Sequence, residues 1–227
     1  FGVRRGLDGA LATTVVAPDR YMLPVPAGVR LRDAALVEPM VTTLEGIRRT
    51  APVPGEEVLI VGSATLGLAG AMILAARGIR THVLLRHPTR AQTVEAAGAI
   101  PWLAGTRAAV EQFDVVREAA GTPTGVQAAF AHVTPGGRVA LLGVPTEPVP
   151  IDVGALVIHD VTMKGVLNGP GQYPTGLEAI ASGEVKPELL IDRVYPFEDI
   201  EAAVARSREP GRERPKVLVQ VDPDAAD

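Results

Sequence analysis

EVLIVGSATLGLAGAMILAARGIRTHVLLRHPTR, residues 57–90, predicts a strand, a tight turn, a helix and a second strand. Val58–Val61 is a short apolar run rich in β-branched residues that ends at Gly62, as expected for a strand buried on both faces of a parallel sheet. The helix predicted from Leu66 to Arg77 is apolar on nearly every side, which suits a helix packed against a sheet, and Gly78 ends it. The stretch therefore predicts a β-α-β unit.

The turn of this unit resembles a phosphate-binding turn. Gly62 to Gly67 stands where dinucleotide-binding proteins have G-x-G-x-x-G, whose glycines permit the turn, the approach of a pyrophosphate and close helix packing. Ala64 takes the second glycine position, so the match is relaxed, and its methyl group narrows the gap without closing it. A tight β-α connection of any doubly wound protein is the alternative. The candidate cofactor residues here are Gly62, Ala64, Thr65, Leu66 and Gly67.

The end of the second predicted strand indicates which dinucleotide would bind. An acid at this point bonds the ribose 2′-hydroxyl of NAD, whereas an arginine accommodates the 2′-phosphate of NADP. The strand His82–Leu85 ends in no acid and is followed by Arg86, His87 and Arg90. Guanidinium and imidazole groups suit a dianionic phosphate because they form charge-assisted hydrogen bonds. We therefore predict that NADP(H) is preferred over NAD(H), the alternative being a basic loop in solvent.

The composition restricts the class of protein. The 227 residues are 47% hydrophobic, carry a net charge of −4 and include no long basic run, so nothing predicts a nucleic acid or anionic membrane partner. No run approaches the roughly 18 to 20 apolar residues that span a bilayer, and the start has no signal-peptide pattern. The absence of cysteine excludes disulfides, thiolate metal ligands and a cysteine nucleophile in this chain. We predict a cytoplasmic globular protein.

Strand and helix patterns alternate along the rest of the chain, which predicts an α/β fold with a doubly wound parallel sheet. The other predicted strands are Leu11–Val16, Ile100–Leu103, Phe113–Val116, Arg138–Leu142, Val161–Val166, Leu190–Val194 and Lys216–Val221. The other predicted helices are Asp33–Pro39 (ended by the proline), Thr42–Thr50, Ala91–Gly98, Thr106–Gln112, Thr124–Val133, Pro174–Ser182 and Phe197–Ser207. Loops at the carboxyl ends of the strands are expected to bind the ligand.

Several ordered segments resemble one family. These segments are DGALATTVVAPDRYMLPVPAGVRLRDAALVEPM (8–40), PGEEVLIVGSATLG (54–67), FDVVREAAG (113–121), PGGRVALLGVP (135–145), KGVLNG (164–169) and ASGEVKPELLIDRVYPFEDIEAAVA (181–205). Together they resemble the zinc-type medium-chain dehydrogenases. The pair Glu38-Pro39 and the basic end of the second strand are most similar to the branch of polyol, threonine and glucose dehydrogenases.

The resemblance implies a division of the chain and an activity. Residues 1–40 would be a remnant of a GroES-like β domain, residues 41–170 the Rossmann dinucleotide-binding domain, and residues 171–227 a return to the catalytic domain. The implied activity is an oxidoreductase that transfers a hydride between NADP(H) and a small alcohol or carbonyl substrate. In the family, a segment preceding position 1 supplies cysteine and histidine ligands of a catalytic zinc, so Zn²⁺ is expected only together with that segment. The fragment alone is expected to bind the cofactor without catalysing.

The resemblance also assigns roles to individual residues. Glu38 takes the position of a zinc-coordinating or zinc-adjacent carboxylate, with an ordinary helix-end acid as the alternative. Thr42, one helical turn further on the same face, would contact the nicotinamide ring. Gly143 and Val144 would lie beside the nicotinamide, and Asn168 would bond its carboxamide unless it belongs to a plain connecting loop.

Three further expectations concern the assembly, one loop and the function. The edge strand Val161–Val166 pairs across a dimer axis in relatives, which implies a homodimer or homotetramer. The arginines of the Arg208–Arg214 loop are predicted to be solvated, with contact to the cofactor pyrophosphate as the alternative. For the function itself, a nucleotide-binding module without turnover remains an alternative. A zinc-independent quinone or enoyl reductase is another, disfavoured by Glu38-Pro39.

Overall fold

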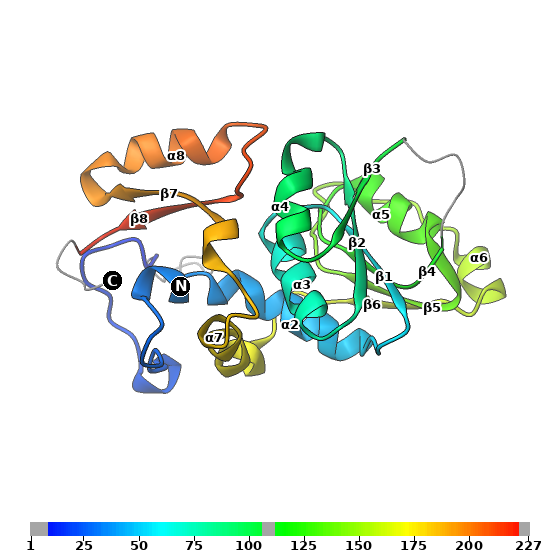
Figure 1. Ribbon diagram of the computed structural model, residues 1–227, viewed down its shortest axis with the longest axis horizontal. Coiled ribbons are helices and arrows are strands. Elements are labelled where there is room, and N and C mark those ends of the chain that lie inside the picture. Colours follow the sequence, from blue (N-terminus) through cyan, green and yellow to red (C-terminus); the bar gives the residue numbers. More distant parts are fainter. Residues whose placement is uncertain (1–8, 106–111, 223–227) are drawn as a thin grey trace.

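The computed structural model describes residues 9–105 and 112–222, which form a larger lobe around one sheet and a smaller lobe around two strands (Figure 1). The strands are β1 (Glu57–Val61), β2 (Arg80–Leu85), β3 (Ile100–Leu103), β4 (Phe113–Glu118), β5 (Val133–Leu141), β6 (Thr162–Gly165), β7 (Ile191–Pro196) and β8 (Lys216–Gln220). The α-helices are α1 (Leu31–Ala34), α2 (Val37–Thr50), α3 (Thr65–Ala76), α4 (Ala91–Ala96), α5 (Pro123–Ala131), α6 (Val153–Ile158), α7 (Tyr173–Ala181) and α8 (Ile200–Arg208). Short 3₁₀ turns occur at Asp19–Tyr21, Pro88–Arg90, Pro170–Gln172, Pro187–Leu189 and Phe197–Asp199.

The main sheet has the strand order β3-β2-β1-β4-β5-β6, and every neighbouring pair is parallel. From β1 the chain adds β2 and β3 on one side of the sheet, and then adds β4, β5 and β6 on the other side. The boundary between β1 and β4 is therefore the topological switch point of a doubly wound sheet. The prediction of an α/β fold with a Rossmann sheet is therefore confirmed. Most of its strands and helices lie close to the predicted positions, and β3 has the predicted bounds. Strand β5 begins at Val133, before the predicted Arg138, and helix α6 was not predicted.

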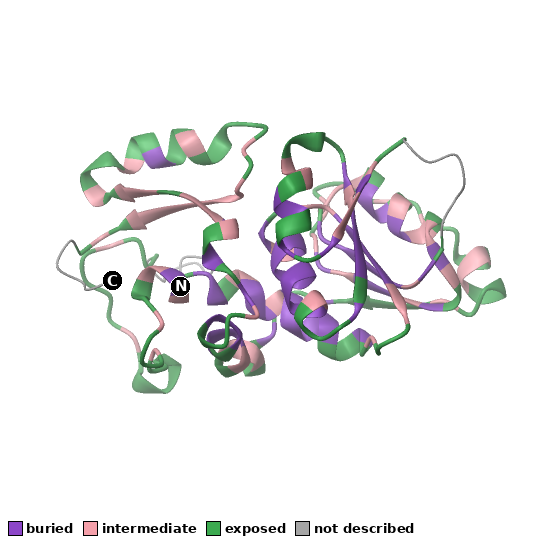
Figure 2. Ribbon diagram, in the orientation of Figure 1, coloured by how far each residue is buried: buried purple, intermediate pink, exposed green. Residues whose placement is uncertain are grey.

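Two hydrophobic clusters cover the two faces of this sheet. Along β1, Val58 and Ile60 belong to the cluster shared with α2, α3 and α7, while Leu59 and Val61 belong to the cluster shared with α5. This alternation is the two-residue period of a strand, and both faces are apolar because helices cover both. Buried residues accordingly concentrate in the sheet and in α2 and α3 (Figure 2).

Helix α2 corrects one prediction. Pro39 was expected to end a short helix begun at Asp33, but α1 ends at Ala34 and α2 starts at Val37 and runs on to Thr50. Pro39 is thus the third residue of α2. The amide groups of the first helical turn have no partner within the helix, so the missing N–H of proline costs nothing there.

The segment before α1 corrects another prediction. Leu11–Val16 was predicted as a strand, yet the described residues before α1 contain only the turn Asp19–Tyr21 and no strand. Val15 and Val16 are exposed, so these β-branched side chains have neither a partner strand nor a core to cover them. The assignment of residues 1–40 to a remnant of a β domain stays a prediction. The predicted helix Thr106–Gln112 lies almost entirely outside the described residues, and Gln112 itself is not helical.

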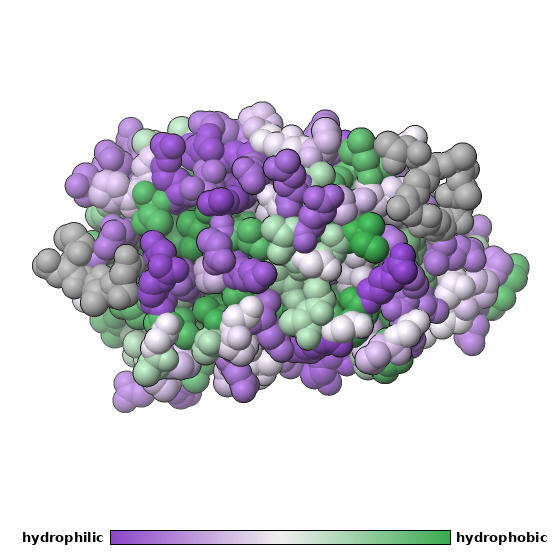
Figure 3. Space-filling model, viewed as in Figure 1, coloured by the Kyte–Doolittle hydropathy of each residue, from purple (hydrophilic) through white to green (hydrophobic). Residues whose placement is uncertain are grey.

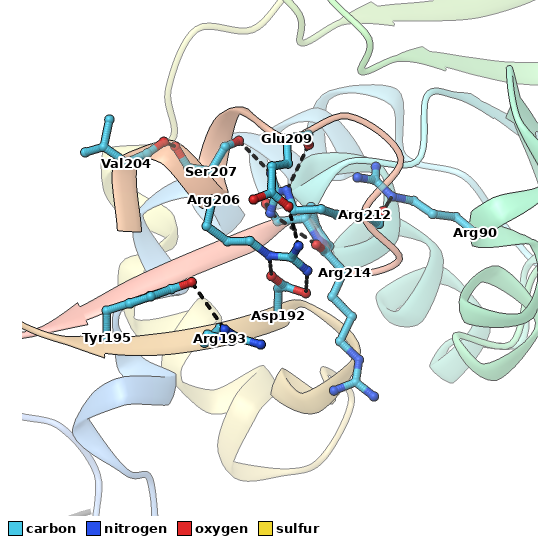
Figure 4. Close-up of polar contacts among 11 residues, drawn as sticks. Arg90, Asp192, Arg193, Tyr195, Val204, Arg206, Ser207, Glu209, Arg212 and Arg214 are labelled. Carbon is cyan, nitrogen blue, oxygen red and sulfur yellow. Dashed lines mark hydrogen bonds and ion pairs between the residues drawn. The ribbon is translucent and has the colours of Figure 1, made fainter. Parts of the chain in front are cut away.

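The smaller lobe contains β7, α8 and β8. The two strands are parallel, and α8 provides the crossover that a parallel pair requires. An ion pair closes the unit, with Arg206 Nε 2.7 Å from Asp192 Oδ2 and Arg206 also bonded to Glu209 (Figure 4). Among the described residues no helix is both long and apolar enough to cross a membrane.

Arg117 is a charged residue inside the core between the sheet and the helices α2 and α3. It is 1% exposed, and its Nη2 donates to the Thr43 carbonyl at 2.7 Å, while Nε and Nη1 have no partner. Gly46 and Gly70 leave room for the guanidinium, because a Cβ on them would lie 3.1 and 3.4 Å from its nitrogens. Burial, and to a smaller extent the charge of Arg77, lowers the pKa of Arg117 to about 9.

We predict that Arg117→Met raises the stability of the fold. A buried charge with two unsatisfied donors costs more free energy than an apolar side chain of similar length, so we expect a gain of about 1 kcal/mol or more. Urea unfolding measures this gain. The matched control is Arg138→Met, which breaks the 2.6 Å pair between Arg138 and Glu56 and should not stabilise. A less stable Arg117→Met variant would show that the guanidinium contributes favourably to packing.

Candidate functional site

The candidate site is a cleft at the carboxyl ends of β1, β2 and β4, beside the switch point. It has a volume of about 290 Å³, and a second hollow of about 270 Å³ shares part of its wall. Both are lined by Gly62, Leu84, Arg86, Ala120 and Thr122. The first is also lined by Ser63, Ala64, His87, Thr89, Arg90, Ala119, Gly211 and Arg212.

The turn between β1 and α3 requires glycine at two positions. Gly62 has φ +105°, and a Cβ on it would lie 2.9 Å from the Ala120 amide nitrogen. A Cβ on Gly67 would lie 2.0 Å from the Gly62 carbonyl oxygen, so the helix can pack this closely only with glycine. Ala64 has an ordinary extended backbone, with φ −80°, and is exposed toward the cleft. Its methyl group is therefore accommodated without closing the turn.

The first turn of α3 can receive an anion. Ala64 is the N-cap residue and offers no side-chain hydrogen bond, so the amide groups of Thr65, Leu66 and Gly67 lack an intrahelical partner. Free amide groups at the positive end of a helix dipole form an anion-binding site. The site adjoins the cleft, as expected for a phosphate of a bound nucleotide.

The three basic residues after β2 all line the cleft but differ in their contacts. Arg90 is partly buried, and its Nη1 and Nε donate to the carbonyls of Ser63 at 2.9 Å and Arg212 at 2.8 Å. Arg86 and His87 are exposed, and within the described part of the chain the Arg86 guanidinium makes no hydrogen bond or ion pair. Arg90 therefore joins parts of the cleft wall, while Arg86 is free to bind a ligand.

The loop between α8 and β8 reaches the cleft from the smaller lobe (Figure 4). Arg212 donates to the carbonyls of Ser207 at 2.8 Å and Pro215 at 3.0 Å, which fixes its guanidinium at the end of α8. Burial and, to a smaller extent, the charge of Arg212 lower the pKa of Arg90. The cleft thus gathers three arginines, and an anionic ligand would relieve their repulsion. From the sequence, the arginines of this loop were predicted to be solvated, with contact to the cofactor pyrophosphate as the alternative.

Glu118, the last residue of β4, organises the loop that faces the turn between β1 and α3. Its side chain is fully buried, and Oε1 accepts hydrogen bonds from the amides of Ala120 at 2.9 Å and Gly121 at 2.8 Å. Burial raises the pKa of the Glu118 carboxyl, and the amide hydrogen bonds oppose the rise. The sequence analysis missed Glu118. The available signal was an acid at the end of a buried strand directly before Ala119-Ala120-Gly121.

The residues predicted to lie near a nicotinamide occur at the ends of β5 and β6. A Cβ on Gly143 would lie 2.2 Å from the Gly121 amide nitrogen, so the loops after β4 and β5 touch through their backbones. Val144 is 70% exposed at this edge. Asn168 is exposed in the loop after β6, and its Oδ1 accepts from the Gly169 amide at 2.6 Å. Thr42 joins this loop to α2, because its hydroxyl donates to the Leu167 carbonyl at 3.2 Å.

Glu38 is exposed in the first turn of α2, near Tyr173, whose pKa is raised by burial and to a smaller extent by the Glu38 charge. A structural or catalytic zinc needs three or four ligands. Across residues 9–105 and 112–222 no group of three or more histidine, cysteine, aspartate or glutamate side chains is close enough to hold a metal. Glu38 therefore offers a single carboxylate, and the described residues do not fit a zinc site by themselves.

The fold and this cleft define a doubly wound α/β protein with a basic cleft at its switch point. Residues 65–182, just over half of the chain, match the family described as zinc-binding dehydrogenase, and the chain belongs to that family. It is 27% identical over 225 residues to the sorbitol dehydrogenase of Bacillus subtilis, covering 94% of this chain and 64% of that relative. It is 29% identical over 217 residues to the L-threonine 3-dehydrogenase of Streptomyces coelicolor, covering 90% and 63%. The resemblance to zinc-type medium-chain dehydrogenases is thus confirmed.

Solved structures share the fold. The short chain alcohol dehydrogenase of Escherichia coli CFT073, solved with the cofactor NADH, has a TM-score of 0.80 at 18% identity, over 88% of this chain and 62% of that one. A zinc-binding dehydrogenase of Sinorhizobium meliloti 1021, bound to NADP, has a TM-score of 0.78 at 22% identity, over 86% and 61%. The chain spans less than two thirds of the length of these relatives.

We predict that Glu118→Leu and Glu118→Gln differ sharply. Leucine leaves the amides of Ala120 and Gly121 without an acceptor, and two orphaned donors should cost about 2 kcal/mol or more in the free energy of unfolding. Glutamine keeps an acceptor oxygen and should cost less. Urea unfolding of both variants is the measurement, and equal losses would show that Glu118 does not act through these two hydrogen bonds.

Proposed function

We propose that this chain binds a nicotinamide dinucleotide across the switch point and, in the whole protein, takes part in hydride transfer to or from a small alcohol or carbonyl compound. The observation that carries the proposal is the cleft itself, in which the Gly62 turn, the free amides at the start of α3 and the unpaired Arg86 meet. Relatives named as a sorbitol dehydrogenase and an L-threonine 3-dehydrogenase support this class of substrate.

The two halves of the dinucleotide would bind to different residues. The adenosine half would lie in the cleft between β1, β2 and β4, with its pyrophosphate at the amides of Thr65 and Leu66. The nicotinamide half would extend past Glu118 toward Val144 and Asn168. When bound, the nicotinamide supplies the carbon that accepts or donates the hydride. The apolar Val144 side chain would exclude water from one face of the ring, and the Asn168 amide would orient its carboxamide.

Two residues of α2 complete the proposal. Thr42 would stand beside the nicotinamide, because its hydroxyl is bonded to the loop that carries Asn168. Glu38 lies one turn earlier on the same helix and would face the reaction site of the whole protein. Since the described residues hold no zinc site of their own, we derive no step from a metal.

We further propose that NADP(H) is preferred over NAD(H). Arg86, Arg90 and Arg212 give the adenosine end a positive charge that no acid among the described residues of the cleft wall offsets, and the 2′-phosphate would supply the balancing charge. His87 adds an imidazole that can form a hydrogen bond with the phosphate. The two structural relatives with bound cofactor hold NADH in one case and NADP in the other. The preference therefore depends on the residues of this cleft.

Arg86→Ala tests the preference. Removing the free guanidinium deletes charge-assisted hydrogen bonding to a dianion that is worth roughly 1.5 to 3 kcal/mol in total. We expect affinity for NADPH to fall by about ten- to a hundredfold while affinity for NADH stays the same, as measured by calorimetric titration at one salt concentration. The control is Arg80→Ala, an exposed arginine at the start of the same strand that pairs with Glu57. Equal losses for both cofactors with Arg86→Ala would contradict the proposal.

We also propose that the chain self-associates at the end of the sheet formed by α6 and β6. All four residues of β6 are exposed and pair on one side only, with β5. Val157 and Ile158 of the preceding helix are 75% and 79% exposed, and Figure 3 shows a small apolar patch at the outer edge of this end of the molecule, among more polar side chains. An unpaired edge strand beside apolar side chains suits contact with a second copy.

Glutamate at both Val157 and Ile158 should separate the copies, because it places two charges in an apolar contact. We expect light scattering to give an oligomeric mass for the native chain and a monomeric mass for this double variant. Val204→Glu, on the exposed face of α8 in the smaller lobe, is the control and should leave the mass unchanged. A monomeric native chain would rule out this contact.

A further inference from the structure

Glu45 of α2 is a buried acid that the proposed chemistry does not use. Its side chain is 10% exposed, and Oε1 accepts from Arg48 Nη2 at 2.6 Å and Arg49 Nε at 2.7 Å. Its other oxygen, Oε2, accepts from Arg48 Nε at 2.8 Å and Gln172 Nε2 at 3.2 Å. The hydrogen bonds from Arg48 and then Arg49 lower the pKa of Glu45 to about 2, so this carboxylate is ionised throughout the neutral range.

The residues that are hydrogen-bonded to Glu45 include one that contacts the start of the loop 165–172, between β6 and α7, and one that lies at its end. At the start of the loop, Arg49 Nη1 donates to the Gly165 carbonyl at 3.2 Å, and Lys164 Nζ donates to the Arg49 carbonyl at 2.9 Å. At the end, Gln172 carries the hydrogen bond to Glu45. The carboxylate therefore holds two of the side chains that attach the loop to α2, Arg49 and Gln172.

The middle of the loop lies directly on the same helix. A Cβ on Gly169 would be 2.4 Å from the Val41 carbonyl oxygen and 2.7 Å from Glu45 Cβ, so the loop backbone touches α2 at this glycine. Thr42 adds the hydrogen bond to the Leu167 carbonyl. Asn168 stands between these two contacts, and its position is set by α2.

This loop follows the carboxyl end of β6 and lies on the far side of the switch point from the basic cleft. A dinucleotide that crosses the switch point places its two halves on opposite sides of it. The loop consequently belongs to the nicotinamide half and takes no part in the adenosine half. Any group that fixes the loop should affect one half of the ligand alone.

We infer that Glu45 is a positioning residue, which holds the 165–172 loop on α2 so that Asn168 meets the nicotinamide half of the cofactor. The inference rests on the proposed function. Glu45 acts through Arg49 and Gln172 and does not touch the ligand itself. Its role is distinct from that of Arg86, which would contact the 2′-phosphate.

Glu45→Gln tests the inference by calorimetry with two ligands, NADPH and adenosine 2′,5′-bisphosphate, which lacks the nicotinamide half. Loosening the loop should lower affinity for NADPH about tenfold, equivalent to about 1.4 kcal/mol. Affinity for adenosine 2′,5′-bisphosphate should remain unchanged. A purely structural role in the fold would weaken both ligands equally, and that result would overturn the inference.

Two further variants make the test decisive. Gln172→Leu removes only the hydrogen bond at the end of the loop and leaves the arginine pairs of Glu45 intact, so it should show the same selective loss to a smaller degree even if Glu45→Gln folds poorly. Glu56→Gln breaks a comparable pair with Arg138 just before β1 and should change neither affinity. A native chain that binds neither ligand would refute the proposed function. A native chain that binds both, with no selective loss in either loop variant, would refute the inference alone.

Discussion

The site depends on close backbone contact at the carboxyl edge of the main sheet. The turn between β1 and α3, the loop after β4 and the loop after β5 approach one another so closely that Gly62, Gly67 and Gly143 leave no room for a Cβ. Glu118 holds the loop after β4 in place, because its carboxylate accepts hydrogen bonds from two backbone amides of that loop. At these glycines no side chain projects, so the edge leaves room for a ligand that lies across the strands.

Charge distinguishes the two halves of this edge. On the β2 side, the cleft is lined by arginines, of which Arg90 joins the Ser63 carbonyl to the Arg212 carbonyl and so links the two lobes. On the β6 side, Glu45 is bonded to Arg49 and Gln172, the residues through which we infer that it holds the 165–172 loop. The β2 side would bind the charged group of the ligand, and the β6 side would fix the orientation of the ligand.

Much of the fold could be predicted because its strands are apolar runs bounded by glycine, as at Val58–Val61 and Ile100–Leu103. Two predictions were wrong because the structure of these residues depends on their neighbours in the fold. The β-branched run Leu11–Val16 has no partner strand, and Pro39 is tolerated because it falls in a first helical turn. Contacts between distant segments left no signal in the sequence. Arg90 and Arg212 lie 122 positions apart, so the linking role of Arg90 became visible only in the structure.

The central claim is that one dinucleotide lies across the switch point, with its 2′-phosphate at Arg86. A crystal structure of this chain with NADPH tests it most directly. We predict the 2′-phosphate within hydrogen-bond distance of Arg86, the pyrophosphate at the amides of Thr65 and Leu66, and the nicotinamide half beside Val144 and Asn168. NADPH bound elsewhere on the molecule, or bound with its 2′-phosphate in solvent away from Arg86, would contradict the account.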